Sequence, residues 1–181
     1  MYADLREDLV VLRRNTTSGR STLALMLTNR GIGALACYRA AVALRRRQIP
    51  LAPLVLLRVC QHRYGVDIDH RADLRPGINL VHGFGIVIGA HTVVNHGCTL
   101  FHGVTLGNRM SKQVGSMRED GCPTLENDVL VCAGAKVLGK IVIGEGSVIA
   151  ANAVVTESVP ARSLVVGNPG RVIRTLDRPP F

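Results

Sequence analysis

The stretch VCAGAKVLGKIVIGEGSVI, residues 131–149, places an aliphatic side chain at every sixth position. A strand has a period of two residues and a helix a period of about 3.6, so neither element explains a spacing of six. A six-residue repeat with an inward aliphatic residue is typical of a triangular parallel β-helix, in which each unit forms one flat face and one corner. This stretch therefore predicts a β-helix in which three units complete one coil.

The same spacing extends beyond this stretch, with one slip of two residues and one long interruption. The aliphatic positions are Ile68, Leu74, Leu80, Ile88, Val94, Leu100, Leu106, Leu125, Val131, Val137, Ile143, Ile149 and Val155. We therefore predict a β-helix domain at residues 67–160, with a long loop at 107–124, and a C-terminal tail at 161–181. A loop of this length inside so regular a repeat is more often functional than accidental.

Residues 1–66 lack the repeat and predict an α-helical N-terminal region. Leu5, Leu9 and Leu12 share one face of a first expected helix. A second is expected over residues 32–44, ended by Pro50, and a third over residues 54–63, ended by Gly65. Such a region can cap the first coil of the β-helix, whose edge is otherwise unpaired.

The net charge of +9 is concentrated in this helical region. Residues 1–66 carry a net charge of +8, including the run Arg45-Arg46-Arg47, whereas residues 67–181 carry +1. A solvated helix face is the plainest interpretation of such a run. Peripheral attraction to an anionic membrane surface or an acidic glycan is the second interpretation. Nucleic acid is disfavoured, because the basic region shows no recognised binding motif.

The cysteine pattern and the absence of long apolar runs indicate the cellular compartment. Five Cys without paired spacing, and no secretory signal, predict a protein of the reducing cytoplasm. The sequence contains no run of about 18 uncharged apolar residues, so no transmembrane helix is predicted. The expected location is therefore the cytoplasm, with the inner face of the membrane as the place to which the basic region would direct the chain.

Two histidines occupy equivalent positions of the repeat. His82 follows Leu80-Val81 and His102 follows Leu100-Phe101, an interval of three units plus the slip. Parallel strands of adjacent coils lie about 4.8 Å apart, so the two imidazoles should be neighbours on the outer surface. An exposed histidine ladder without a role is one interpretation. Beside a long loop, a general base with an assisting donor is the other.

Asp67 precedes His82 in the chain and lies at the start of the repeat. On its own it is most simply a turn or cap aspartate. If the chain folds it near His82, its carboxylate would hold the imidazole in one tautomer and stabilise the imidazolium.

The string from Asp67 to Arg171 resembles the serine acetyltransferase family of hexapeptide-repeat acyltransferases. The segments that carry the resemblance are Val66-Asp67-Ile68, residues 82–89 (HGFGIVIG), residues 104–107 (VTLG), residues 133–139 (AGAKVLG) and residues 166–169 (VGNP). The resemblance implies a left-handed β-helix, assembly as homotrimers or paired trimers, and acetyl-CoA as co-substrate in a groove between neighbouring coils. No metal is expected.

The resemblance also assigns roles to individual residues. The catalytic histidine of the family matches His82, and its partnering aspartate matches Asp67. His82 would remove the proton from an acceptor hydroxyl, which attacks the thioester carbonyl of acetyl-CoA directly, while a backbone or loop donor stabilises the oxyanion. Further matches are a position that contacts the pantetheine arm (Ala133) and the start of the CoA-facing loop (Gly107 and Asn108). Apart from the resemblance, Arg171 in the C-terminal segment is a candidate for a CoA phosphate, and a solvated tail arginine is the equal alternative.

The chain departs from the pattern of the serine enzymes near the acceptor. Those enzymes carry an aspartate just before the catalytic histidine, where this chain has Val81. They carry Arg-His-Pro at the end of the long loop, where this chain has Gly121-Cys122-Pro123. Each lost charge-assisted contact to serine would be worth about 1.5–3 kcal/mol.

His102 stands where the family typically has an uncharged amide side chain. Together with residues 103–109 and the Cys122-Pro123 pair that closes the long loop, it makes the chain similar to the branch of the family that acetylates exopolysaccharide sugars. A sugar hydroxyl is therefore expected as the acceptor in preference to serine, with His102 and Cys122 lining its pocket. A nucleophilic role for Cys122, through an acyl-enzyme, stays open.

Two other classes of function stay open. His91 and His96, with His82 or His102, resemble the metal-binding histidines of carbonic-anhydrase-like hexapeptide proteins. A silent scaffold, whose repeat serves only trimer assembly, is the other alternative.

Overall fold

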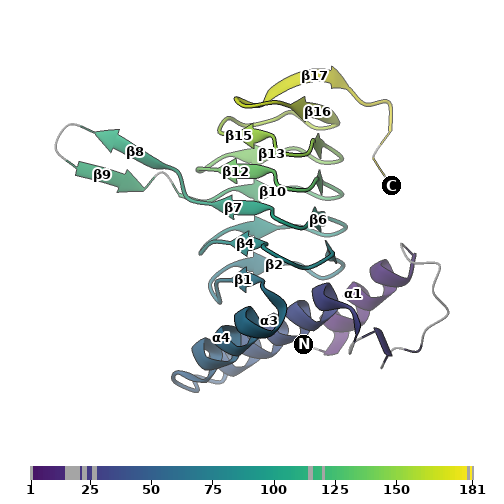
Figure 1. Ribbon diagram of the computed structural model, residues 1–181, viewed down its shortest axis with the longest axis vertical. Coiled ribbons are helices and arrows are strands. Elements are labelled where there is room, and N and C mark those ends of the chain that lie inside the picture. The colour runs from purple at the N-terminus through teal and green to yellow at the C-terminus, as the bar shows by residue number, and fades with distance from the viewer. Residues whose placement is uncertain are drawn as a thin grey trace.

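The computed structural model describes residues 2–14, 21, 24–25, 28–113, 116–119, 121–178 and 180. Helices come first, among them α1 (Tyr2–Arg14), α3 (Arg30–Arg46) and α4 (Ala52–Tyr64). Short strands follow and stack into a column above the helices (Figure 1). The architecture is a left-handed parallel β-helix with N-terminal helices, so the predicted fold class is confirmed.

Successive coils contribute short strands to three sheets, and the sheets form the faces of the column. The first face holds β1 (Asp67–Ile68), β4 (Val87–Ile88), β7 (Thr105–Gly107), β12 (Lys136–Leu138) and β15 (Val154–Val155). The second face holds β2 (Asp73–Leu74), β5 (Val93–Val94), β10 (Thr124–Leu125) and β13 (Val142–Ile143). The third face holds β3 (Asn79–Val81), β6 (Thr99–Phe101), β11 (Leu130–Val131), β14 (Val148–Ile149), β16 (Ser163–Val166) and β17 (Arg171–Thr175).

The aliphatic positions of the repeat form one continuous core. Every position in the predicted series, from Ile68 to Val155, is exposed by 3% or less. The register pairs Ile68 with Ile88 and Ile88 with Leu106, so the first coil is longer than the second by the slip in the repeat. The slip therefore widens one corner of the first coil and leaves the inward side chains stacked.

The helices cap the first coil, as expected. Gly31 of α3 lies so close to β3 that a Cβ there would come within 2.0 Å of the Leu80 carbonyl oxygen. Tyr38 of α3 donates its hydroxyl hydrogen to the Ala72 carbonyl at 2.6 Å and accepts from the Leu74 N–H at 3.3 Å. Gly65 ends α4 in the left-handed conformation, with φ of 69°.

A buried ion pair fixes two helices to the first coil. Arg39 of α3 binds the Asp8 carboxylate of α1 at 3.2 Å, and the two side chains are exposed by 6% and 0%. Arg39 also donates to the carbonyls of Leu74 and Arg75, and one Asp8 oxygen accepts from the N–H groups of Gly77 and Ile78. Burial, the largest influence, raises the pKa of the Asp8 carboxyl, and Arg39 and these N–H groups oppose that rise.

The segment predicted as a loop at 107–124 contains a hairpin. β8 (Met110–Gln113) and β9 (Ser116–Glu119) pair in antiparallel register and project from the column (Figure 1). The two strands satisfy each other's backbone N–H and C=O groups away from the column. The segment therefore reaches outward as a β-ribbon.

The segment predicted as a tail adds two strands to the third face. β16 pairs in parallel with β14, and β17 folds back antiparallel on β16. These strands cover the end of the column opposite the helices (Figure 1). Within the described ranges, no helix combines the length and apolar character needed to cross a bilayer.

Candidate active site

The two histidines singled out by the repeat lie side by side. The corners leading from the third face to the first form one edge of the column, here called the third–first edge (residues 82–86, 102–104 and 132–135). His82 and His102 open the first two of these corners, because β3 and β6 pair with Val81 opposite Phe101. Their ring centroids are 5.8 Å apart with 66° between the planes. The predicted adjacency is confirmed, and both side chains are exposed to solvent.

A pocket of about 320 Å³ opens beside His82. Its other lining residues are Thr28, Asn29 and Arg30, at the start of α3. The Asn29 side chain caps this helix by accepting from the Ile32 N–H at 3.0 Å. The helix start therefore forms one wall of the pocket and places Arg30 next to the candidate base.

Arg30 is a residue that sequence reasoning missed. Its guanidinium carbon lies 5.8 Å from the centre of the Phe84 ring, in the same corner as His82. The close fit of α3 on this corner explains the position, since a Cβ on Gly83 would lie 2.6 Å from the Gly31 nitrogen. No motif in the sequence pointed to it, because the contact depends on how α3 docks on the first coil.

Asp67 begins β1 of the first face, next to this edge, but its side chain is bound elsewhere. Its N–H donates to the Ile86 carbonyl at 2.9 Å, immediately after the His82 corner. Its carboxylate accepts from Gln61 Nε2 at 3.1 Å, and among the described residues no hydrogen bond joins it to His82. The predicted bond between Asp67 and His82 is therefore not formed in this structure, and the orienting role of Asp67 stays a prediction.

Cys122 does not join the histidines within one chain. It precedes β10 of the second face, and its sulfur would lie 3.4 Å from a Cβ placed on Gly89. Gly89 follows β4, so both belong to the first–second edge (residues 89–92, 108–109, 121–123 and 139–141), across the first face from His82. The expectation that His102 and Cys122 line one pocket is therefore wrong for a single chain. The separation of the two residues could have been predicted by counting repeat units.

The residues expected to hold CoA are divided between the two edges. Ala133 lies in the corner above His102, and the Gly134 N–H donates to the His102 carbonyl at 2.9 Å. Gly107 and Asn108 lie at the first–second edge, where Asn108 Oδ1 accepts from the Gly121 N–H at 3.2 Å.

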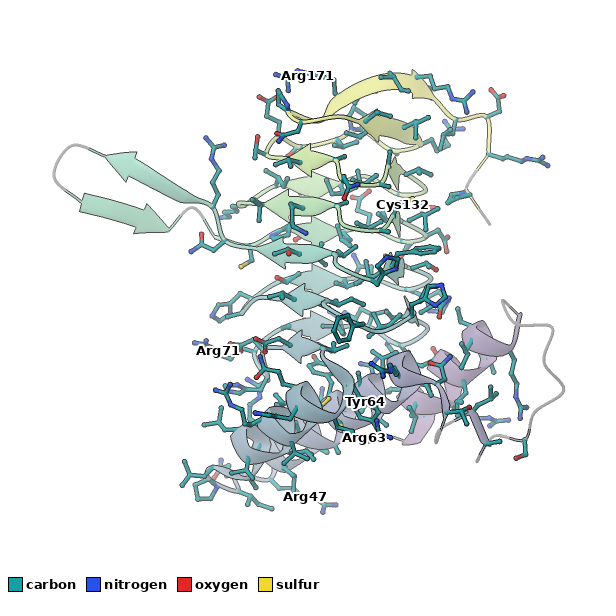
Figure 2. All side chains as sticks on the ribbon, in the orientation of Figure 1. Arg47, Arg63, Tyr64, Arg71, Cys132 and Arg171 are labelled. Atoms are coloured by element: carbon teal, nitrogen blue, oxygen red, sulfur yellow. The ribbon has the colours of Figure 1, made fainter. Side chains whose placement is uncertain are left out.

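Arg171 stands apart from both groups, at the start of β17 near the top of the column (Figure 2). Its guanidinium lies 4.0 Å from the Glu157 carboxylate. It is therefore exposed and far along the column from the histidine pair.

Lys136 ties two corners of the third–first edge together. Its ammonium donates to the Gly103 carbonyl at 2.6 Å and to the Gly134 carbonyl at 3.0 Å. These bonds fix the corner that follows His102 against the corner that carries Ala133. In the sequence, Lys136 stands out only as part of the motif at residues 133–139.

The histidines of the metal-binding alternative lie at other corners. His91 follows β4 at the first–second edge, and His96 follows β5, where its Nδ1 lies 2.9 Å from the Pro76 carbonyl oxygen. Among the described residues, no group of three or more His, Cys, Asp or Glu side chains is arranged to hold a metal ion.

Comparison with known proteins identifies a close set of relatives. Residues 123–157 match the family described as "Bacterial transferase hexapeptide (six repeats)". The serine acetyltransferase of Synechococcus elongatus is 40% identical over 173 residues, which cover 96% of this chain and 69% of that protein. The serine acetyltransferase of Helicobacter pylori is 37% identical over 175 residues, which cover 97% of this chain and 99% of that protein.

Solved structures of serine acetyltransferases superpose on this chain. The serine acetyltransferase of Brucella abortus in complex with coenzyme A superposes with a TM-score of 0.86 at 31% identity, over 97% of this chain and 68% of that one. The Neisseria gonorrhoeae serine acetyltransferase in complex with serine gives a TM-score of 0.83 at 28% identity, over 96% of this chain and 69% of that one. With near-complete coverage and one shared fold, this chain is an acyltransferase and belongs to the serine acetyltransferase family of hexapeptide-repeat proteins.

Proposed function

We propose that the chain transfers the acetyl group of acetyl-CoA to the hydroxyl of L-serine. The adjacent pair His82 and His102 beside a pocket carries this proposal, because it offers a base at an exposed edge of the fold. Relatives named serine acetyltransferase, at 37–40% identity, favour serine as the acceptor. They do not support the preference for an exopolysaccharide sugar that the sequence pattern suggested.

In this mechanism His82 acts as the general base. Its imidazole takes the proton from the acceptor hydroxyl as the oxygen attacks the thioester carbonyl of acetyl-CoA. The tetrahedral intermediate then collapses, the carbon–sulfur bond breaks, and the thiolate of CoA takes a proton back from the imidazolium. His102 would assist as a hydrogen-bond donor, and Asp67 would orient His82 once its carboxylate leaves Gln61.

Acetyl-CoA is the co-substrate in this proposal, and relatives solved with coenzyme A support it. The corner residue above the histidines, Ala133, would contact the pantetheine arm. Gly107 and Asn108 would face the CoA from the other edge, and Arg171 would reach a phosphate. The roles of Ala133, Gly107 and Asn108 rest on the family resemblance, and that of Arg171 rests on its charge in the C-terminal segment.

The division of site residues between two edges favours a homotrimer. In a ring of three parallel columns, each copy presents a different edge to each neighbour, since such interfaces are heterologous. The first–second edge of one copy would then bring its Cys122, Gly107 and Asn108 to the His82 edge of the next copy. Sedimentation should give a mass of three chains or a multiple of three, and an active monomer would contradict the shared site.

The family resemblance implies an arginine near the acceptor that this chain lacks, since Gly121 stands at that position, and Arg30 beside His82 offers a cation instead. We expect its guanidinium to bind the carboxylate of serine, since such charge-assisted contacts are paired and directional. Arg30→Gln should raise the KM for L-serine about 10–100-fold and change kcat much less. Arg174→Gln, an exposed arginine of β17, is the matched control. An unchanged KM for serine would remove Arg30 from the acceptor site.

A sugar hydroxyl is the second candidate acceptor. Val81 and Cys122 favour it, because neither can bind the ammonium or carboxylate of serine as a charged partner would. The test is acetyl-CoA-dependent thiol release with L-serine, nucleotide-sugars and oligosaccharides in parallel. Turnover on serine supports the proposal, whereas silence on serine with transfer to a sugar would establish the second candidate.

A further inference from the structure

The outward face of α4 is exposed to solvent and carries apolar side chains around Arg58 and His62. Leu51, Leu54, Val55 and Val59 are exposed by 71%, 52%, 62% and 59%, and Ile49 in the preceding turn by 41%. Their spacing of three and four residues places them on one helical face. The opposite side of α4 is also apolar and contains the buried Pro53 and Cys60. A helix that is apolar on both sides indicates that its outward face contacts something other than water.

The same helical pair is strongly basic. Between Arg30 and Tyr64 the sequence holds seven arginines and not one Asp or Glu. Of these, Arg39 is neutralised by Asp8. Arg45, Arg46 and Arg47, at the end of α3, form no ion pair with any described residue. Figure 2 shows Arg47 at the end of the molecule opposite Arg171.

A cavity of about 740 Å³ lies between the end of α3 and the first coil. Its charged lining residues are Arg45, Arg46 and Arg47 near the end of α3, Arg39 further along that helix, Arg71, Asp73 and Arg75 of the coil, and Asp4 of α1, so the cations outnumber the carboxylates. Arg71 and Arg75 are each paired with a neighbouring aspartate, at 2.9 Å and 3.1 Å. The three helix arginines therefore leave positive charge at the mouth of a cavity large enough for an anionic headgroup.

We propose that this helical pair docks on an anionic lipid surface. The docking surface comprises Arg45, Arg46, Arg47, Ile49, Leu51, Leu54, Val55 and Val59. Its apolar side chains enter the boundary between headgroups and acyl chains, and its arginines bind lipid phosphates, as in other interfacial helices. Lipid rather than a second copy is favoured by charge, because two copies meeting through this face would bring unpaired arginines together. The inference does not depend on the acceptor.

Vesicle flotation of the full chain tests the proposal. Binding is expected to vesicles of phosphatidylglycerol and phosphatidylcholine, to be weak on pure phosphatidylcholine, and to fall when salt rises from about 0.05 M to 0.5 M. The variant Arg45→Gln, Arg46→Gln, Arg47→Gln should lose about fivefold in partitioning for each arginine, and so about 100-fold in all. The variant Leu54→Gln, Val55→Thr, Val59→Thr should lose at least about tenfold.

Matched substitutions at the other end of the column serve as the control. Val172 and Ile173 of β17 are exposed by 48% and 59%, so Val172→Thr with Ile173→Gln changes the same chemistry elsewhere and should leave binding unchanged. Failure of the wild-type chain to bind anionic vesicles at low salt would overturn the proposal. Binding that the α4 substitutions leave unchanged would also overturn it. The proposal would also be overturned if the wild-type protein did not bind vesicles and the α4 substitutions split its assembly into smaller units. A second copy of the chain would then be what covers this face.

Discussion

His82→Ala is expected to lower the turnover number of acetyl transfer at least about 100-fold, the usual scale of general-base catalysis. The substitution removes the imidazole that borders both the pocket at Arg30 and the ring of His102. The KM for acetyl-CoA should change little, because the proposed CoA contacts lie in other corners and on the other edge. Steady-state kinetics of thiol release measure both quantities.

A control is needed because His82 has a positive φ of 61°, which few side chains adopt without strain. Asp128 has a φ of 56° at a corner between the second and third faces, away from both edges of the proposed site, so Asp128→Ala makes a comparable backbone change elsewhere. His82→Asn adds a side chain that tolerates this conformation but cannot act as the base. Near-normal turnover in His82→Ala, with the assembly intact, would remove His82 from the chemistry.

Asp8→Ala is expected to lower the free energy of unfolding by about 3–5 kcal/mol, the largest effect on stability that we predict. The substitution leaves the Arg39 guanidinium buried without its counter-ion. It also frees the N–H groups of Gly77 and Ile78, which both donate to Asp8. Because α1, α3 and the first coil meet at this pair, the helical cap should loosen as well.

Thermal unfolding followed by circular dichroism measures this effect. For a chain of this size each kcal/mol shifts the Tm by roughly 2–4 °C, so a shift of about 6–20 °C is expected. Asp177→Ala, near the C-terminus, should stay within about 0.5 kcal/mol of the wild type. A similarly small loss for Asp8→Ala would mean that the ion pair contributes nothing to holding the helices on the coil.

The repeat made the column predictable from the sequence. An inward position every six residues leaves one arrangement of the core, and Ile68 through Val155 all lie where the spacing placed them. The same counting brought His82 and His102 together. The repeat also determines the corner at which Cys122 lies, because a residue just before Leu125 must lie one corner away from the histidines.

Features that depend on tertiary docking were beyond the reach of the sequence pattern. Arg30 reaches the pocket because Gly31 allows α3 to approach the Leu80 carbonyl, a contact between segments far apart in the chain. The hairpin at 110–119 has no apolar alternation to reveal it, because its strands project from the column. Likewise, β16 and β17 follow the last aliphatic position of the repeat and are fixed by pairing with β14.

Direct transfer of the acetyl group to serine, with His82 as the base, is measured with acetyl-CoA labelled with carbon-13 at the acetyl carbonyl. The wild-type chain is incubated with this substrate and L-serine, and the label is followed by nuclear magnetic resonance. We expect an ester signal on the serine oxygen to replace the thioester signal, and His82→Ala to slow this change at least about 100-fold. Label that stays in the thioester, or that accumulates on the protein at Cys122, would contradict direct transfer by His82.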